Sequence, residues 1–135
     1  MSTIKVTNIQ DTSGGSSSTS EQIAKGRAKA WVNFDGTGTI AIRDSFNVTS
    51  LTDNNTGDYT VNFSNSFGNT NYCFQLSCTD SGSGYNQTDG YTYGGWKRGS
   101  DSTLRTTSTV RFKVGYTGND VYYDQSEVMV TIFGG

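Results

Sequence analysis

Histidine and proline are absent from this chain of 135 residues, and cysteine occurs only twice. Without histidine the chain cannot form a Ser–His–Asp or Cys–His site, a histidine general base or a histidine metal ligand. Charged residues make up 16% of the chain, the net charge is −2, and like charges form no block, which argues against nucleic acid as a partner. No apolar run approaches the length of a membrane span, so we expect no membrane insertion.

The two cysteines, Cys73 and Cys78, lie in the segment YCFQLSC, whose alternation is typical of a strand. Five residues of strand span about 16 Å, and an odd spacing puts the two side chains on opposite faces. A disulfide needs Cα atoms within about 7 Å of each other. We therefore expect two free thiols that act as small packing residues and that cannot share a zinc ion.

Alternating apolar and polar residues fill most of the chain from Ala30 onward, as in KAWVNFDGTGTIAIRDSFNV at 29–48. The segment DNNTGD at 53–58 is a hairpin signal, and it lacks the distant glutamate that would favour a calcium loop. The pattern predicts an all-β chain, an antiparallel β-sandwich of jelly-roll or immunoglobulin-like type with seven to eight short strands. The expected strands are 30–34, 40–46, 48–52, 59–63, 72–79, 104–107, 110–116 and 127–133.

Residues 1–27 differ from the rest and are expected to form an extended arm, with the sandwich domain at 28–135. Ile4, Val6 and Ile9 form a weak β-like patch that we assign to attachment. The Ser/Gly-rich segment 11–20 is typical of a flexible linker, and a short helix with Ser20 as its N-cap is expected after it. Hydrophobic residues are 32% of the chain, and so thin a core suggests that self-association adds stability.

A long glycine-rich segment, 79–102, carries aromatic and basic side chains of the kind found in adaptable binding loops. Its aromatic faces could stack on a sugar ring. The alternative is a local hairpin packed on the sheet. The candidate binding residues are Tyr85, Tyr91, Tyr93, Trp96, Lys97 and Arg98.

Carboxylates are the remaining candidates for catalysis, because a glycosidase needs two of them across a sugar. Most lie in predicted turns, where aspartate binds backbone N–H groups. Asp44 lies within a strand, and we expect it to pair with an arginine on a neighbouring strand. The sequence therefore predicts no enzyme, no cofactor and no metal site. The carboxylates considered are Asp35, Asp44, Asp80, Asp89, Asp101, Asp124 and Glu127.

The segment KAWVNFDGTGTIAIRDSFNVTSLTDNNTGDYTVNF, residues 29–63, resembles a module of tailed-phage proteins, especially those of marine and cyanobacterial phages. The module is found in tail fibres and other virion appendages. The opening MSTIKVTNIQDTSGG also resembles the start of fibre-type proteins, whereas the chain from Cys73 onward does not. The resemblance implies a virion structural protein, a homotrimer, without catalytic residues. Nothing here resembles the long shaft of a typical fibre.

These features favour a short tail-fibre-like appendage or fibre tip. Its arm would bind other virion proteins of the tail, baseplate or capsid, and its aromatic segment would contact a host surface glycan or protein. A capsid or tail decoration protein is the alternative, and a polysaccharide-degrading tail enzyme is the less favoured third. Because the N-terminus lacks the apolar segment of a secretory signal, we expect synthesis in the host cytoplasm and a final place in the virion.

Overall fold

The computed structural model describes residues 2–79, 93–95, 104–116 and 121–135. Strands dominate, and α1 is the one helix in this described part of the chain. The elements are β1 (Asn8–Gln10), β2 (Ser17–Thr19), α1 (Ser20–Gly26), β3 (Ala28–Asp35), β4 (Ala41–Phe46), β5 (Val48–Asn55), β6 (Asp58–Phe63), β7 (Cys73–Cys78), β8 (Tyr93–Gly95), β9 (Thr109–Tyr116), β10 (Val121–Tyr122) and β11 (Val128–Phe133).

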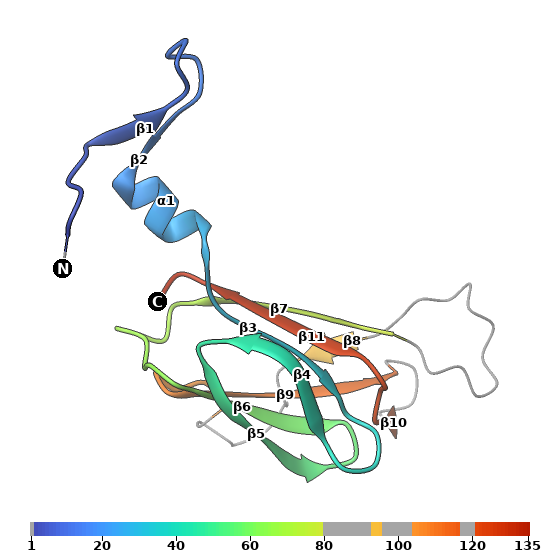
Figure 1. Ribbon diagram of the computed structural model, residues 1–135. Coiled ribbons are helices and arrows are strands. Elements are labelled where there is room, and N and C mark those ends of the chain that lie inside the picture. The colour runs from blue at the N-terminus through green and yellow to red at the C-terminus, as the bar shows by residue number, and fades with distance from the viewer. Residues whose placement is uncertain (1, 80–92, 96–103, 117–120) are drawn as a thin grey trace.

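Two antiparallel sheets form a sandwich, which confirms the predicted all-β class. One sheet has the order β4-β3-β11-β7, and the other has the order β10-β9-β6-β5 with β8 added on β9. Figure 1 shows them as two layers, with β3, β7 and β11 in one and β5, β6 and β9 in the other. The strand β1 pairs with β2 as a separate hairpin in the arm.

The number of strands in the sandwich and the structure of the segment 104–107 differ from the prediction. In the described part of the chain nine strands, β3 to β11, lie outside the arm, and of these β8 and β10 were not predicted. The segment 104–107, expected as a strand, makes a single bridge between Arg105 and Val110. Its Thr106 hydroxyl accepts hydrogen bonds from the backbone N–H groups of Ser108 and Thr109, at 3.1 and 2.9 Å. That local bonding turns the chain into β9 and replaces the ladder of a strand.

Alternation along the strands places apolar side chains between the sheets, as predicted. Phe34 from one sheet packs edge-on against Tyr59 from the other, with ring centroids 5.1 Å apart, and Tyr59 lies 6.0 Å from Phe112. Burial of these rings is the main stabilising term for a core this small. The buried apolar residues are Ala30, Val32, Phe34, Tyr59, Val61, Phe63, Phe67, Tyr72, Val110, Phe112, Val114, Val128, Val130 and Ile132.

The hairpin predicted at 53–58 is confirmed, with β5 and β6 joined through Thr56 and Gly57. Gly57 has φ 61°, which an L side chain rarely adopts. A Cβ there would also collide with the carbonyl oxygen of Val114. The turn backbone is satisfied because the Gly57 N–H donates to Asp124 Oδ1 at 2.7 Å. The glycine is therefore required by both conformation and space.

Asn47 stands at the corner where the chain leaves β4 in one sheet and enters β5 in the other. It is the one non-glycine residue with positive φ, 56°, in the described part of the chain. Its Nδ2 donates to the carbonyl oxygens of Lys29 and Asn65, at 3.1 and 3.2 Å. Its Oδ1 accepts from the Asn65 backbone N–H at 2.7 Å. One side chain thus ties three segments at the corner.

The arm is more ordered than the sequence suggests, and the linker prediction for 11–20 is wrong. The Asp11 carboxylate accepts hydrogen bonds from the backbone N–H groups of Ser13, Gly15 and Ser16, which closes a turn between β1 and β2. The predicted Ser20 cap is also wrong by one residue. Thr19 is the N-cap, and it forms a capping box with Gln22.

The arm projects from one end of the sandwich, as Figure 1 shows. Its helix and strands have no substantial packing against the sandwich strands. At seven residues, α1 is far too short to cross a bilayer. The described residues contain no helix long and apolar enough to do so.

The prediction that the cysteines form no disulfide is confirmed. Cys78 is half-buried and packs against the core, whereas Cys73 is exposed and does not have the predicted packing role. Side chains along β7 alternate between exposed and half-buried, so the two thiols point to opposite faces of the sheet.

Candidate interaction site

The predicted aromatic binding segment lies almost wholly outside the described residues. Tyr85, Tyr91, Trp96, Lys97 and Arg98 fall there. The backbone of Tyr93 begins β8, which pairs with β9, so part of this segment belongs to the sheet. The role assigned to these six residues stays a prediction.

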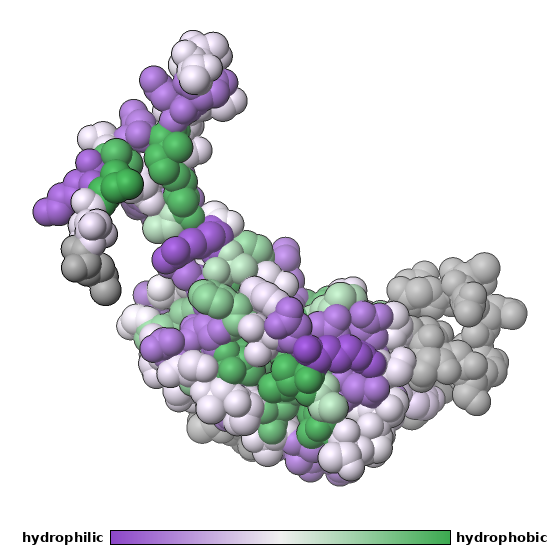
Figure 2. Space-filling model, viewed as in Figure 1, coloured by the Kyte–Doolittle hydropathy of each residue, from purple (hydrophilic) through white to green (hydrophobic). Residues whose placement is uncertain are grey.

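The residues predicted for attachment are exposed apolar side chains on the arm. The exposed fractions are 87% for Ile4, 48% for Val6 and 58% for Ile9. The structure adds Ile23 of α1, 39% exposed, which the sequence reading had not singled out. No residue from 2 to 27 is buried. The arm therefore offers apolar surface without a core of its own, visible as green atoms in Figure 2.

Short-range hydrogen bonds hold the arm in shape. The Ser13 hydroxyl and the backbone N–H groups of Gly15 and Ser16 lower the pKa of Asp11, because they stabilise its charged form. In α1, Lys25 Nζ lies 2.7 Å from Glu21 Oε1, and this bond and its charge lower the pKa of Glu21. Such exposed contacts fix local geometry but contribute little stability.

A group of apolar side chains, some exposed and some half-buried, lies among polar ones on the outer side of the four-stranded sheet. We call it the apolar face. Trp31 of β3 is its centre, with Phe46 of β4 directly opposite in the register and Thr131 of β11 on its other side. Met129 and Phe133 lie two residues to either side of Thr131, within diagonal reach of Trp31. Phe46 is 54% exposed and Met129 36%.

The position of Trp31 in the sequence is a signal for this face that the predictions above did not use. In AKAWVNF the tryptophan occupies the phase of the alternation that belongs to polar residues, beside Lys29 and Asn33. A large aromatic residue out of phase predicts contact on the outer side of a sheet.

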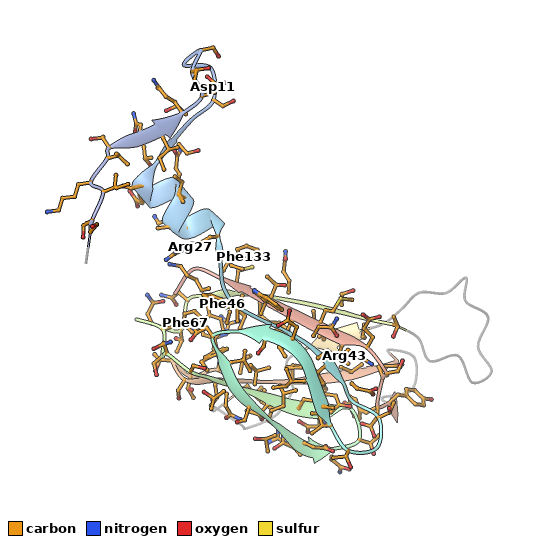
Figure 3. All side chains as sticks on the ribbon, in the orientation of Figure 1. Asp11, Arg27, Arg43, Phe46, Phe67 and Phe133 are labelled. Carbon is orange, nitrogen blue, oxygen red and sulfur yellow. The ribbon has the colours of Figure 1, made fainter. Side chains whose placement is uncertain are left out.

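A groove of about 340 Å³ opens where the arm joins the sandwich. Phe46 forms one wall, and the side chains of Arg27 and Lys29 bring two positive charges to it. In Figure 3, Arg27, Phe46 and Phe133 gather at this end of the molecule. The groove is therefore continuous with the apolar face. Its lining residues are Arg27, Ala28, Lys29, Phe46, Asn47, Ser64 and Asn65.

The outer side of the five-stranded sheet is polar by comparison, and we call it the polar face. Arg111 binds Asp58 through two nitrogens, at 2.8 and 2.9 Å, and Lys113 Nζ lies 3.7 Å from the same carboxylate. Asn62 Nδ2 donates to the hydroxyls of Ser50 and Thr52, each at 3.1 Å. These side chains satisfy one another across the strands.

Of the carboxylates considered for catalysis, Asp80, Asp89 and Asp101 lie outside the described residues, and the other four have structural partners. Arg43 pairs with Asp35 at 3.0 Å, so the predicted pairing of Asp44 with an arginine is wrong. Asp44 is exposed and accepts a hydrogen bond from the Ser45 N–H. Asp44 lies opposite Asn33 in the register, and Arg43 is the extra residue of the bulge between this pair and the next, Phe34 with Ile42.

Asp124 accepts a hydrogen bond of 2.7 Å from the Tyr59 hydroxyl. Burial raises the pKa of Tyr59 well above its usual range, and the Asp124 carboxylate adds to the effect. The phenol therefore stays protonated and ties β6 to the segment before β11. Within the described ranges, no three acidic or cysteine side chains are grouped to hold a metal ion.

Comparison with known proteins finds no matching family model, no matching curated protein and no matching solved structure.

Proposed function

We propose that this protein is a virion structural protein of a tailed phage, a short fibre-like appendage that contacts the host surface. The arm holds it on the particle, and the sandwich with the segment 79–102 faces outward. The main support is the arm: Ile4, Val6 and Ile9 are exposed on a segment whose helix and strands have no substantial packing on the described sandwich strands. Apolar side chains displayed in this way are typical of an element that is completed by a partner.

The resemblance of residues 29–63 to modules of phage appendages supports two parts of the proposal. These are that the protein belongs to a phage particle and that it contacts the host surface. A sandwich whose polar groups satisfy one another suits a particle surface. The buried polar side chains of the described residues all have hydrogen-bond partners.

Attachment is tested in phage particles. Ile4→Asp with Ile9→Asp places two charges where the arm would meet its partner. Thr3→Asp with Asn8→Asp adds the same charge at neighbouring exposed positions as the control. We expect the first pair to reduce the copies per purified particle at least about tenfold, and the control to leave them unchanged. Equal copy numbers for both would refute attachment through the arm.

Host contact is tested separately with Trp96→Ala. Loss of a binding aromatic costs roughly 2 kcal/mol or more of affinity, and an exposed one costs little stability. We expect poor adsorption of mutant particles and nearly normal unfolding of the protein. Normal adsorption would favour a decoration protein without a receptor role, and a density map of the virion would then place it on tail or capsid.

A further inference from the structure

We propose that the arm of one copy docks on the apolar face of a second copy of this chain. The proposal rests on the arm being an assembly element, as proposed above, and it names the arm's partner. Two surfaces that carry exposed apolar side chains lie on the same chain, and within the described residues each keeps part of its apolar area exposed. Ile4, Val6, Ile9 and Ile23 belong to the first, and the second is the face centred on Trp31.

In the described part of one chain the two surfaces do not cover each other. The arm runs away from the sandwich end, as Figure 1 shows, and its elements lack substantial contacts with the sandwich strands. Local hydrogen bonds, in the turn closed by Asp11 and in the capping box of Thr19, hold the arm's own shape. Folding back onto its own face would require the chain between α1 and β3 to reverse at Arg27.

The dimensions of the two surfaces match. A seven-residue helix is about 10 Å long, and a three-residue strand is also about 10 Å long. A sheet of four strands is about 14 Å wide. The arm can therefore cover the region around Trp31 and Phe46. The groove beside Phe46 can admit an aliphatic side chain.

The contact is between different surfaces, so each copy gives an arm and receives one. Such heterologous contacts close into rings or continue as filaments. The homotrimer expected from the sequence is one such ring. The polar face takes no part, because its side chains already bind one another.

The test uses the full chain and two variants that block one surface each. Phe46→Asp blocks the face, and Ile4→Asp with Ile9→Asp blocks the arm. Light scattering at micromolar concentration should show an oligomer for the wild type and monomers for each variant. Thr52→Asp, on an exposed position of the opposite sheet edge, is the matched control and should associate like the wild type. Thermal unfolding of each protein checks that the sandwich is intact.

Mixing the two blocked variants shows whether the contact joins an arm to a face. One has an intact arm and the other an intact face, so a one-to-one heterodimer should form, at least about tenfold tighter than either variant alone. Failure to form it would overturn the proposal in favour of arm–arm or face–face contact. A monomeric wild type would also overturn it. In that case, loss of the arm variant from virions would still support the proposed function, with another virion protein as the partner.

Discussion

The two outer faces of the sandwich differ although the strands that build them follow the same alternation. On the polar face, Asp58, Arg111 and Asn62 bind partners on adjacent strands. On the apolar face, Trp31 and Phe46 occupy the equivalent outward positions. A sheet with one buried side needs only its inner residues to be apolar. The outward aromatics are thus not required by the fold, and the proposed contact with a second copy would account for them.

The largest loss of unfolding free energy is expected when the buried carboxylate of the polar face, Asp58, is removed. Asp58 is 3% exposed because Arg111 and Lys113 cover it. Asp58→Ala removes the carboxylate that pairs with both cations. We expect a loss of about 2–3 kcal/mol in unfolding free energy, less than for a fully buried pair because both cations retain some exposure. Urea denaturation measures it.

Asp53→Ala is the control, because Asp53 is exposed on β5 of the same sheet. It should change the unfolding free energy by less than about 0.5 kcal/mol. Similar losses for the two variants would mean that the carboxylate cluster is not what stabilises the polar face.

The next largest loss of unfolding free energy is expected at Asn47, in the corner between the two sheets. Asn47→Ala loses the side-chain hydrogen bonds and places alanine at a positive φ, at a cost of about 2 kcal/mol. Asn47→Gly loses the same hydrogen bonds but tolerates the backbone, so about 1 kcal/mol is expected. Chemical denaturation of both variants separates the two contributions. A larger loss for glycine would contradict the assigned conformation.

Hydrogen bonds between outward side chains should have a smaller effect. Asn62→Ala removes the bonds to Ser50 and Thr52 and should cost about 1 kcal/mol of unfolding free energy. Gln75→Ala, on the outer side of β7, is the control on the opposite face and should be neutral within about 0.5 kcal/mol. Equal effects would erase the contrast between the faces.

The smallest effect is spectroscopic. In Trp96→Phe, Trp31 is the single tryptophan of the chain and reports on the apolar face. If a second copy covers this face, its fluorescence should shift to the blue as concentration rises through the association range. Adding Phe46→Asp should remove the shift. A spectrum independent of concentration, in a protein shown to be oligomeric, would place the interface elsewhere.

The sequence was sufficient for the all-β class, most strands, the hairpin at 53–58 and the opposed cysteines. Each follows from local rules: period-two alternation, turn chemistry and the geometry of one strand. It was insufficient for Thr106, whose hydroxyl turns a predicted strand, and for Asp11, which orders a predicted linker. Both errors come from single side chains that bind nearby backbone, which composition does not reveal.

What the tertiary structure decided is which residues meet. The chain order does not say that β3 lies between β4 and β11, and this order is what surrounds Trp31 with Phe46, Met129 and Phe133. Arg43, the extra residue of a bulge in β4 opposite Asn33 and Phe34, pairs with Asp35 of β3, a partner that alternation alone did not indicate. Alternation fixes the side of a sheet on which a residue lies, within one strand. Neighbours across strands depend on register and sheet order, which arise from packing the whole chain.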